Sequence, residues 1–239
     1  MTDDIENDVA GTVDWKKVIA RFVFTILLMG ALLFLSAGTF RWWEGWLYFI
    51  LSAVLLIGGR VILLVKSPET AAERMSAGEK EDTKTWDKKL VPLVALVIPL
   101  LIWIVTGLDK RFGPSLQFPL WVQISALVLH FLFGGIGTWA MLKNRFFSSH
   151  VRIQKERGHV VIEDGPYAWM RHPGYAFGLL SWFMLPFLFN SWWIAIPILI
   201  LTAGYIYRTY LEDQTLQEEL AGYKAYTERV RYRLFPGIW

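Results

Sequence analysis

Residues 165–175 combine residue types that bind anions and flat rings. They read Gly-Pro-Tyr-Ala-Trp-Met-Arg-His-Pro-Gly-Tyr. Pro173 favours the first turn of a helix, where backbone N–H groups lack partners within the helix and, together with the helix dipole, attract anions. Arg171 and His172 add two cationic donors beside this turn. A basic anchor at a membrane surface would account for the arginine and the proline, but it does not require the preceding Gly-Pro-Tyr turn.

A second polar stretch, residues 208–213, follows an apolar segment. Arg208 and Glu212 are four residues apart and therefore share a helix face, which is also the spacing of an ordinary surface salt bridge. Only Asn190-Ser191 separates the two apolar segments between the stretches, which predicts a tight hairpin. The hairpin returns the second stretch to the level of the first. Ionisable residues gathered at a membrane edge indicate a functional site.

Composition excludes several classes of protein. Of the 239 residues, 54% are hydrophobic and only 19% are charged. Soluble domains carry about 25% charged residues, so this chain has the composition of a membrane protein. It has no cysteine, which excludes disulfides, thiolate metal sites and cysteine nucleophiles. The net charge of +3 is typical of loops that face anionic lipid, and we expect no nucleic-acid partner.

Glycine and histidine spacing argues against nucleotide and metal sites. No G-x-G-x-x-G motif follows a strand pattern, so a Rossmann-type site is excluded. The four histidines never pair at three or four residues, and we expect no metal site. A haem held between His130 and His172 is an alternative, although single membrane histidines more often bond to a neighbouring helix.

Six apolar segments approach the roughly 20 residues that a membrane-spanning helix needs. They predict an all-α, polytopic integral membrane helix bundle of about six spans with a tight C-terminal hairpin. The amphipathic residues after Leu211 predict a cytosolic C-terminal helix packed under the bundle. The segments are residues 18–40, 45–65, 90–108, 119–142, 173–189 and 192–211.

The distribution of basic residues predicts the orientation. Twenty lysines and arginines fall in the N-terminal flank, the second and fourth connections and the C-terminal end, and three fall in the other connections. Both termini are therefore expected in the cytoplasm, in a bacterial or archaeal inner membrane. An acidic leader at residues 3–8 argues against a cleaved signal peptide. An outer interfacial belt is expected from Trp42, Trp43, Trp46, Trp121, Trp192 and Trp193.

The long cytoplasmic connections differ in character. Ser67 and Pro68 are the cap and first residue expected of a short helix that ends near Ser76. Residues 78–89 are interpreted as a charged, solvated linker. Residues 143–172 mix apolar, basic and aromatic side chains, and connections of this length are usually functional.

The ordered blocks of the second half resemble the isoprenylcysteine carboxyl methyltransferase family, whose wider group includes membrane phospholipid N-methyltransferases. The blocks are residues 159–175 with their Arg-His-Pro-x-Tyr motif, an apolar hairpin, Arg208-x-x-x-Glu212-Asp213, and Tyr223-x-x-Tyr226. The resemblance covers residues 144–239. It departs from the family pattern at Asp213, where a second glutamate is usual, and at Gly178, a small residue placed one position late.

The resemblance implies an all-helical membrane enzyme that uses S-adenosylmethionine. We divide the chain into a four-span region, residues 1–142, and a catalytic region, residues 143–239. The cofactor carboxylate suits Arg171 and the helix start at Pro173, and the aromatic side chains of Tyr167, Trp169 and Tyr175 suit the adenine and the sulfonium. Arg208 would hold the acceptor. The pocket residues implied by the family are His159, Gly165, Tyr167, His172, Tyr175, Glu212 and Asp213.

Several functions stay open at this point. The expected partners are membrane lipids and a lipophilic or lipid-linked acceptor, in an unknown oligomeric state. A carboxylate acceptor is already ionised at pH 7 and needs no base, whereas an amine acceptor, as in phospholipid N-methylation, would need Glu212 as its base. Sterol reductases share related C-terminal motifs but are longer chains. A transporter or sensor scaffold would carry its polar residues near the bilayer midplane, and here they cluster at one face.

Reporter fusions test the predicted topology. With six spans and the observed bias of basic residues, fusions after Leu142 and after Trp239 should both report a cytoplasmic location. A periplasmic signal from either fusion would contradict the six-span arrangement.

Overall fold

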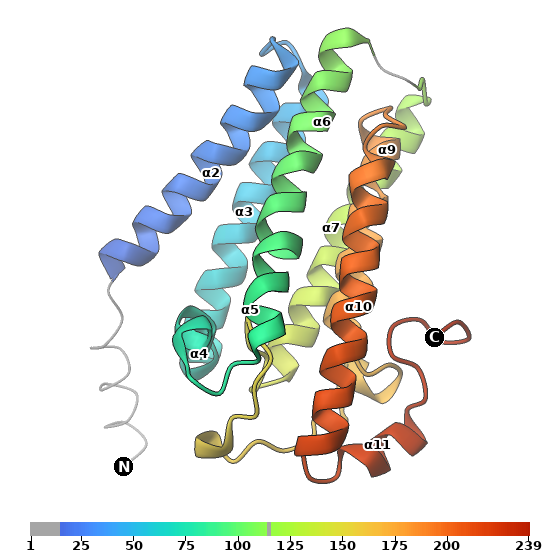
Figure 1. The fold of residues 1–239 in the computed structure, drawn as a ribbon. Helices are drawn as coiled ribbons and strands as arrows, with labels where there is room; N and C mark the ends of the chain where they lie inside the picture. The colour runs from blue at the N-terminus through green and yellow to red at the C-terminus, as the bar shows by residue number, and fades with distance from the viewer. Residues whose placement is uncertain (1–14, 114–115) are drawn as a thin grey trace.

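A computed structural model describes residues 15–113 and 116–239, and every regular element in these ranges is helical (Figure 1). The prediction of an all-α helical membrane bundle is confirmed. The acidic leader at residues 3–8 and the side chains of Lys16, Lys17 and Arg21 lie outside the described residues.

Three helical stretches are long and apolar enough to cross a membrane. Two are single helices, α3 (Trp43–Lys66) and α7 (Leu120–Lys143). The third joins α5 (Thr85–Pro92), a π-helical segment (Leu93–Val97) and α6 (Ile98–Phe112) into one rod. Pro92 and Pro99 flank the π-helical turns, and neither can donate to the helical hydrogen-bond ladder. Shorter apolar helices occur in α2 (Trp15–Ala37) and at residues 173–188, so the count of six spans stays a prediction.

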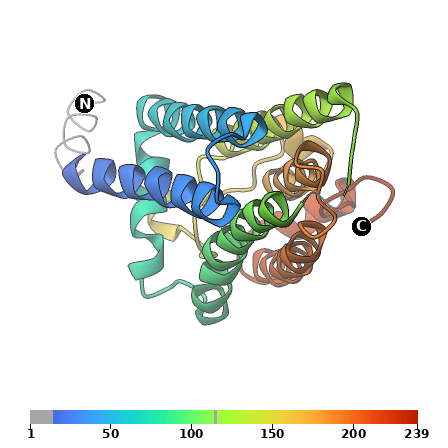
Figure 2. The same ribbon diagram turned by 90° about the horizontal axis from the view of Figure 1, so that it is seen from above.

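The helices form a closed ring when the bundle is seen from above (Figure 2). α2 packs on α3, α3 on α7, α7 on α8 (Pro173–Phe183) and α9 (Leu185–Leu188), α8 on α10 (Ala195–Glu219), α10 on α6, and α6 on α2. One apolar core fills the ring, and its fully buried members come from most of these helices. They include Leu33, Ile102, Leu185 and Ile198.

The C-terminal hairpin differs from its prediction in two respects. The connection between α9 and α10 spans residues 189–194 and is longer than the predicted Asn190-Ser191 turn. Asn190 adopts a positive φ of 57° and accepts hydrogen bonds from the N–H groups of Leu116 and Phe118, which ties the turn to the preceding connection. α10 also continues unbroken to Glu219, and the amphipathic tail forms α11 (Tyr223–Arg229) after it.

One end of the bundle collects the predicted cytoplasmic segments. α4 (Pro68–Ser76), the start of α5, the connection after α7 and α11 all lie there (Figure 1). The predicted helix through Ser76 is confirmed. The interpretation of residues 78–89 as a solvated linker is wrong, because α5 begins at Thr85 and Asp87 is fully buried against α10 and the connection after α7. The predicted division at residue 142 falls at the end of α7 and stays a prediction.

A close helix contact joins α2 and α6 at Gly107. A Cβ atom on Gly107 would collide with Oγ of Ser36 and would lie 2.5 Å from the carbonyl oxygen of Leu33. By contrast, a Cβ atom on Gly135 in α7 would meet nothing within 4 Å. Small residues allow such close approach where helices pack in a membrane.

Gly107→Ala should therefore destabilise the protein. Forcing a methyl group into this contact is expected to cost about 1–3 kcal/mol, visible as a lower thermal midpoint in detergent. Gly135→Ala is the matched control and should be neutral or slightly stabilising, because alanine is the better helix former. Equal midpoints for the two variants would contradict the packing described here.

Candidate active site

A polar cavity opens at the end of the bundle that carries α4 and α11. Its walls come from the connection after α7, the first turn of α8, the polar end of α10, and α11. The space between its walls, with the open solvent at the mouth included, is about 770 Å³. Seven of the predicted site residues line it: His159, Tyr167, Arg171, His172, Tyr175, Arg208 and Glu212.

The other three predicted residues support the walls from behind. Gly165 has a positive φ of 60° and begins the 3₁₀ turn Gly165–Ala168, a conformation that favours glycine. Pro173 is buried at the first position of α8. Asp213 is fully buried and does not line the cavity. The prediction that Trp169 stacks on a bound ring has no support in the geometry, because its side chain is 61% exposed outside the cavity.

Asp213 joins three segments through its carboxylate. The Nε atom of Arg171 lies 3.3 Å from it, the Nε2 atom of His172 lies 3.6 Å from it, and Nε of Arg233 donates to it at 2.8 Å. The hydroxyl of Tyr223 donates at 3.1 Å. Burial by itself would raise the pKa of Asp213, but the adjacent His172, Arg171 and Arg233 lower it to about 2. Asp213 is therefore ionised at neutral pH and fixes Arg171 and His172 of the motif.

The Arg-His pair is held by its backbone as well. The N–H groups of Arg171 and His172 donate to the carbonyls of Tyr232 and Arg233, both at 2.9 Å. The two side chains are buried, and Nε of Arg171 and Nε2 of His172 have no hydrogen-bond partner. Both atoms face the carboxylate of Asp213, so a bound anion would be met by the parts of these side chains that line the cavity.

The expected free N–H groups at the start of α8 are mostly engaged. The N–H groups of Tyr175 and Ala176 both donate to the carbonyl of His172, at 3.1 Å each. Because the capping residue itself accepts these bonds, anion binding falls to the side chains and to the Gly174 backbone, which lines the cavity.

Arg208 has a partner that the sequence pattern did not indicate. Its Nε and Nη2 atoms donate to the carboxylate of Asp87, at 2.8 and 3.1 Å, and Nη2 also donates to the carbonyl of Ser149 at 3.2 Å. Nη1 donates to the hydroxyl of Tyr175, which in turn donates to Glu212 at 2.7 Å. The surface salt bridge between Arg208 and Glu212, the alternative reading of their spacing, is not formed.

Aromatic rings also line the cavity. The rings of Phe146 and His159 stack with centroids 4.4 Å apart, and those of His172 and Tyr175 are parallel at 5.8 Å. Burial lowers the pKa of His159 to about 4, helped by the nearby charges of Arg157 and Arg152. His159 is therefore a neutral ring at physiological pH.

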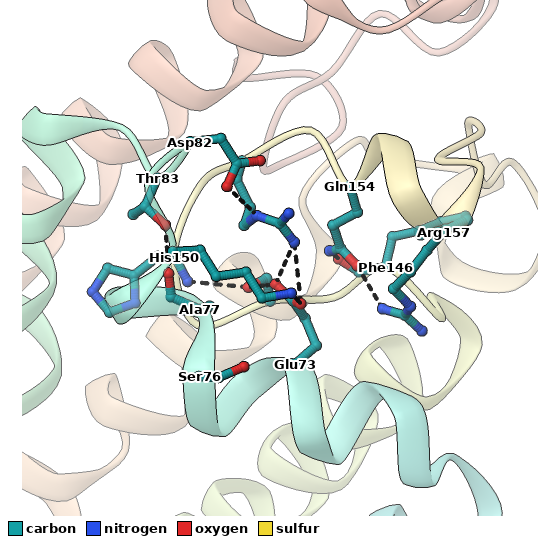
Figure 3. A network of polar contacts seen from close by, with 12 residues as sticks. Glu73, Ser76, Ala77, Asp82, Thr83, Phe146, His150, Gln154 and Arg157 are labelled. Carbon is teal, nitrogen blue, oxygen red and sulfur yellow. Dashed lines mark hydrogen bonds and ion pairs between the residues drawn. The ribbon is translucent and has the colours of Figure 1, made fainter. Parts of the chain in front are cut away.

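A network of charges anchors α4 to the cavity wall (Figure 3). The guanidinium of Arg152, which lines the cavity, donates to Glu73 at 3.0 Å, to Asp82 at 2.8 Å and to Glu156 at 2.7 Å. Lys80 donates to Glu73 at 2.9 Å. Burial tends to raise the pKa of Glu73, but the bonds from Lys80 and Arg152 lower it overall. Sequence reasoning missed Glu73, Asp87 and Arg152, because single acids and bases in charged loops carry no local pattern.

The histidines considered for haem have other partners. His130 Nδ1 lies 2.9 Å from both the carbonyl and the hydroxyl oxygen of Ser181 on α8, whereas His172 faces Asp213. Across residues 15–113 and 116–239, no group of three histidine or acidic side chains could hold a metal ion.

Fold and site together define a helical membrane protein with a polar, aromatic-lined cavity at one end of its bundle. Residues 126–218 match the model of the isoprenylcysteine carboxyl methyltransferase (ICMT) family. That segment contains the predicted site residues from His159 to Asp213, and the match supports the predicted resemblance to this family of membrane methyltransferases. No match was found among curated proteins.

Proposed function

We propose that this membrane methyltransferase transfers a methyl group from S-adenosylmethionine to a carboxylate on a lipophilic acceptor at the cytosolic membrane face. The observation that carries the proposal is the meeting of the Arg171-His172 pair with Arg208, Tyr175 and Glu212 around one cavity. The cavity therefore offers cationic, acidic and aromatic groups within a single site, as a zwitterionic cofactor with an aromatic base requires.

The cavity residues fit the functional groups of S-adenosylmethionine, which supplies an electrophilic methyl group on a sulfonium when bound. The cavity-lining side chains of Arg171 and His172 suit its carboxylate. Glu212 suits its ammonium or ribose hydroxyls. Tyr167 and Tyr175 suit its adenine ring and sulfonium, since aromatic faces attract cations. Asp213 would act one step removed, by holding Arg171 and His172.

Arg208 is proposed to place the acceptor. Four of its five N–H groups have partners in the described part of the chain, one on Nε, two on Nη2 and one on Nη1. The remaining Nη1 hydrogen allows one further bond and not the two-point grip that a free guanidinium gives. An ionised carboxylate needs no base, so the enzyme would contribute orientation and exclusion of water.

The proposed location is a bacterial or archaeal inner membrane, with six spans and both termini in the cytoplasm. Its support is the basic bias of the connections that gather at the cavity end of the bundle (Figure 1). A lipid-linked acceptor would then reach the cavity from the membrane.

A binding experiment and a labelling experiment with S-adenosylmethionine test the cofactor and the acceptor separately. Calorimetry in detergent should show binding by the wild type and its loss in the combined variant His172→Ala and Glu212→Ala, because both residues line the cavity. Unchanged binding in that variant would move the cofactor site elsewhere.

Labelling of a lipid extract with methyl-labelled S-adenosylmethionine tests the acceptor. Label that mild base releases as methanol marks a carboxyl ester, and base-stable label marks N-methylation.

Arg208→Lys should separate acceptor placement from cofactor binding. Lysine keeps the charge but cannot hold Asp87, Ser149 and Tyr175 in one plane. We expect nearly intact cofactor affinity and methyl transfer reduced about tenfold or more, which is at least ~1.4 kcal/mol of transition-state stabilisation. Unchanged turnover would reject the role in placing the acceptor, and lost cofactor binding would assign Arg208 to the cofactor.

A further inference from the structure

Asp87 lies outside the cavity but contacts two parts of its wall. It is fully buried in the first turn of α5. Its carboxylate accepts the two bonds from Arg208 and a third, at 2.7 Å, from the backbone N–H of Val151. Arg208 and Val151 line the cavity, and Asp87 does not. Asp87 is thus placed to act through these residues and not on a bound molecule.

A chain of hydrogen bonds leads from Asp87 into the cavity. Arg208 donates hydrogen bonds both to Asp87 and to the hydroxyl of Tyr175, and that hydroxyl donates to Glu212. The guanidinium carbon of Arg208 also lies 5.1 Å from the centre of the Tyr175 ring. Three elements remote in sequence, α5, α10 and α8, meet in this chain, so the orientation of each group depends on the one before it.

The contacts of Asp87 occupy one edge of the Arg208 guanidinium. Asp87 takes the edge formed by Nε and Nη2, and the Ser149 carbonyl takes the second Nη2 hydrogen. Nη1 is left on the side of Tyr175. A guanidinium without this carboxylate would keep its charge but lose the two-point contact that fixes its plane.

We propose that Asp87 is a positioning residue for methyl transfer, which fixes the plane of Arg208. The proposal rests on the proposed function, and it assigns part of the site to a segment that precedes the family match at residues 126–218. The competing role is that of a counter-charge that only keeps the buried Arg208 paired.

Hydrogen–deuterium exchange of Asp87→Asn tests the contact without any cofactor or acceptor. The substitution keeps the shape and removes the charge, so peptides that contain Val151 should take up deuterium faster, while peptides from the middle of α7 should not. Asp164→Asn is the matched control, because Asp164 pairs with Lys143 at the surface with 64% of its side chain exposed. Unchanged exchange around Val151 in Asp87→Asn would overturn the proposal.

Kinetics then separate positioning from a counter-charge role. With labelled S-adenosylmethionine and a membrane-lipid extract, Asp87→Asn should bind the cofactor within about threefold of wild type and transfer label about tenfold or more slowly. Because Asp87 acts through Arg208, combining it with Arg208→Lys should cost little beyond the slower single variant. A rate within about twofold of wild type, or losses that multiply in the combined variant, would overturn the proposal.

Two outcomes keep the proposal distinct from the function on which it rests. A wild type that labels no lipid contradicts the proposed function, and the exchange experiment still tests Asp87. Should Asp87→Asn fail to fold, Asp87→Glu keeps the charge and displaces Arg208 by the length of one methylene. It should retain the wild-type melting temperature and cofactor affinity while transferring label more slowly, and a wild-type rate would overturn the proposal.

Discussion

The buried carboxylate of Asp213 is the contact on which the site depends most. It brings α10, the Arg-His-Pro segment and the C-terminal segment to one point, because Arg171, His172 and Arg233 all face it. Removing a carboxylate from water is costly, and only several donors around it can offset that cost. The low pKa of Asp213, about 2, shows that here they do. With Asp213 ionised, Arg171 and His172 are fixed beside the cavity that they line.

Asp87 gives the other side of the cavity the same kind of anchor. Asp213 organises the groups suited to a cofactor, and Asp87 organises Arg208, Tyr175 and Glu212. The two acids lie on different helices, α5 and α10, and each contacts residues of the cavity wall without lining the cavity itself. Each of the two buried acids pairs with the basic side chains of one part of the wall. Several basic groups can therefore lie around a small cavity without strong mutual repulsion.

The cavity end of the bundle is held by charge and the rest by apolar packing. Among the helices, close contacts such as Gly107 against α2 and the shared apolar core hold the bundle together. At the cavity end, Arg152 links Glu73 of α4 to the connection after α7. Because this connection has little regular structure, its ion pairs with α4 and the hydrogen bond from Val151 to Asp87 of α5 take over the role that a hydrogen-bonded ladder plays elsewhere. The first half of the chain is therefore a structural partner of the site.

The sequence by itself determined the features that depend on local order. Hydrophobic runs of sufficient length predicted the helices, proline positions predicted the starts of α4 and α8, and the spacing of the polar blocks predicted that Arg171 and Glu212 share a cavity. Tertiary structure alone decided the partners of the buried charges, since Asp87 and Arg208 are 121 residues apart and Glu73 and Arg152 are 79 apart. Periodicity and capping report on neighbours within about one helical turn, and they carry no information about which distant charge fills a buried site. For the same reason the charged run around Asp87 predicts a solvated linker, and only the packing of α5 against α10 shows that Asp87 is buried.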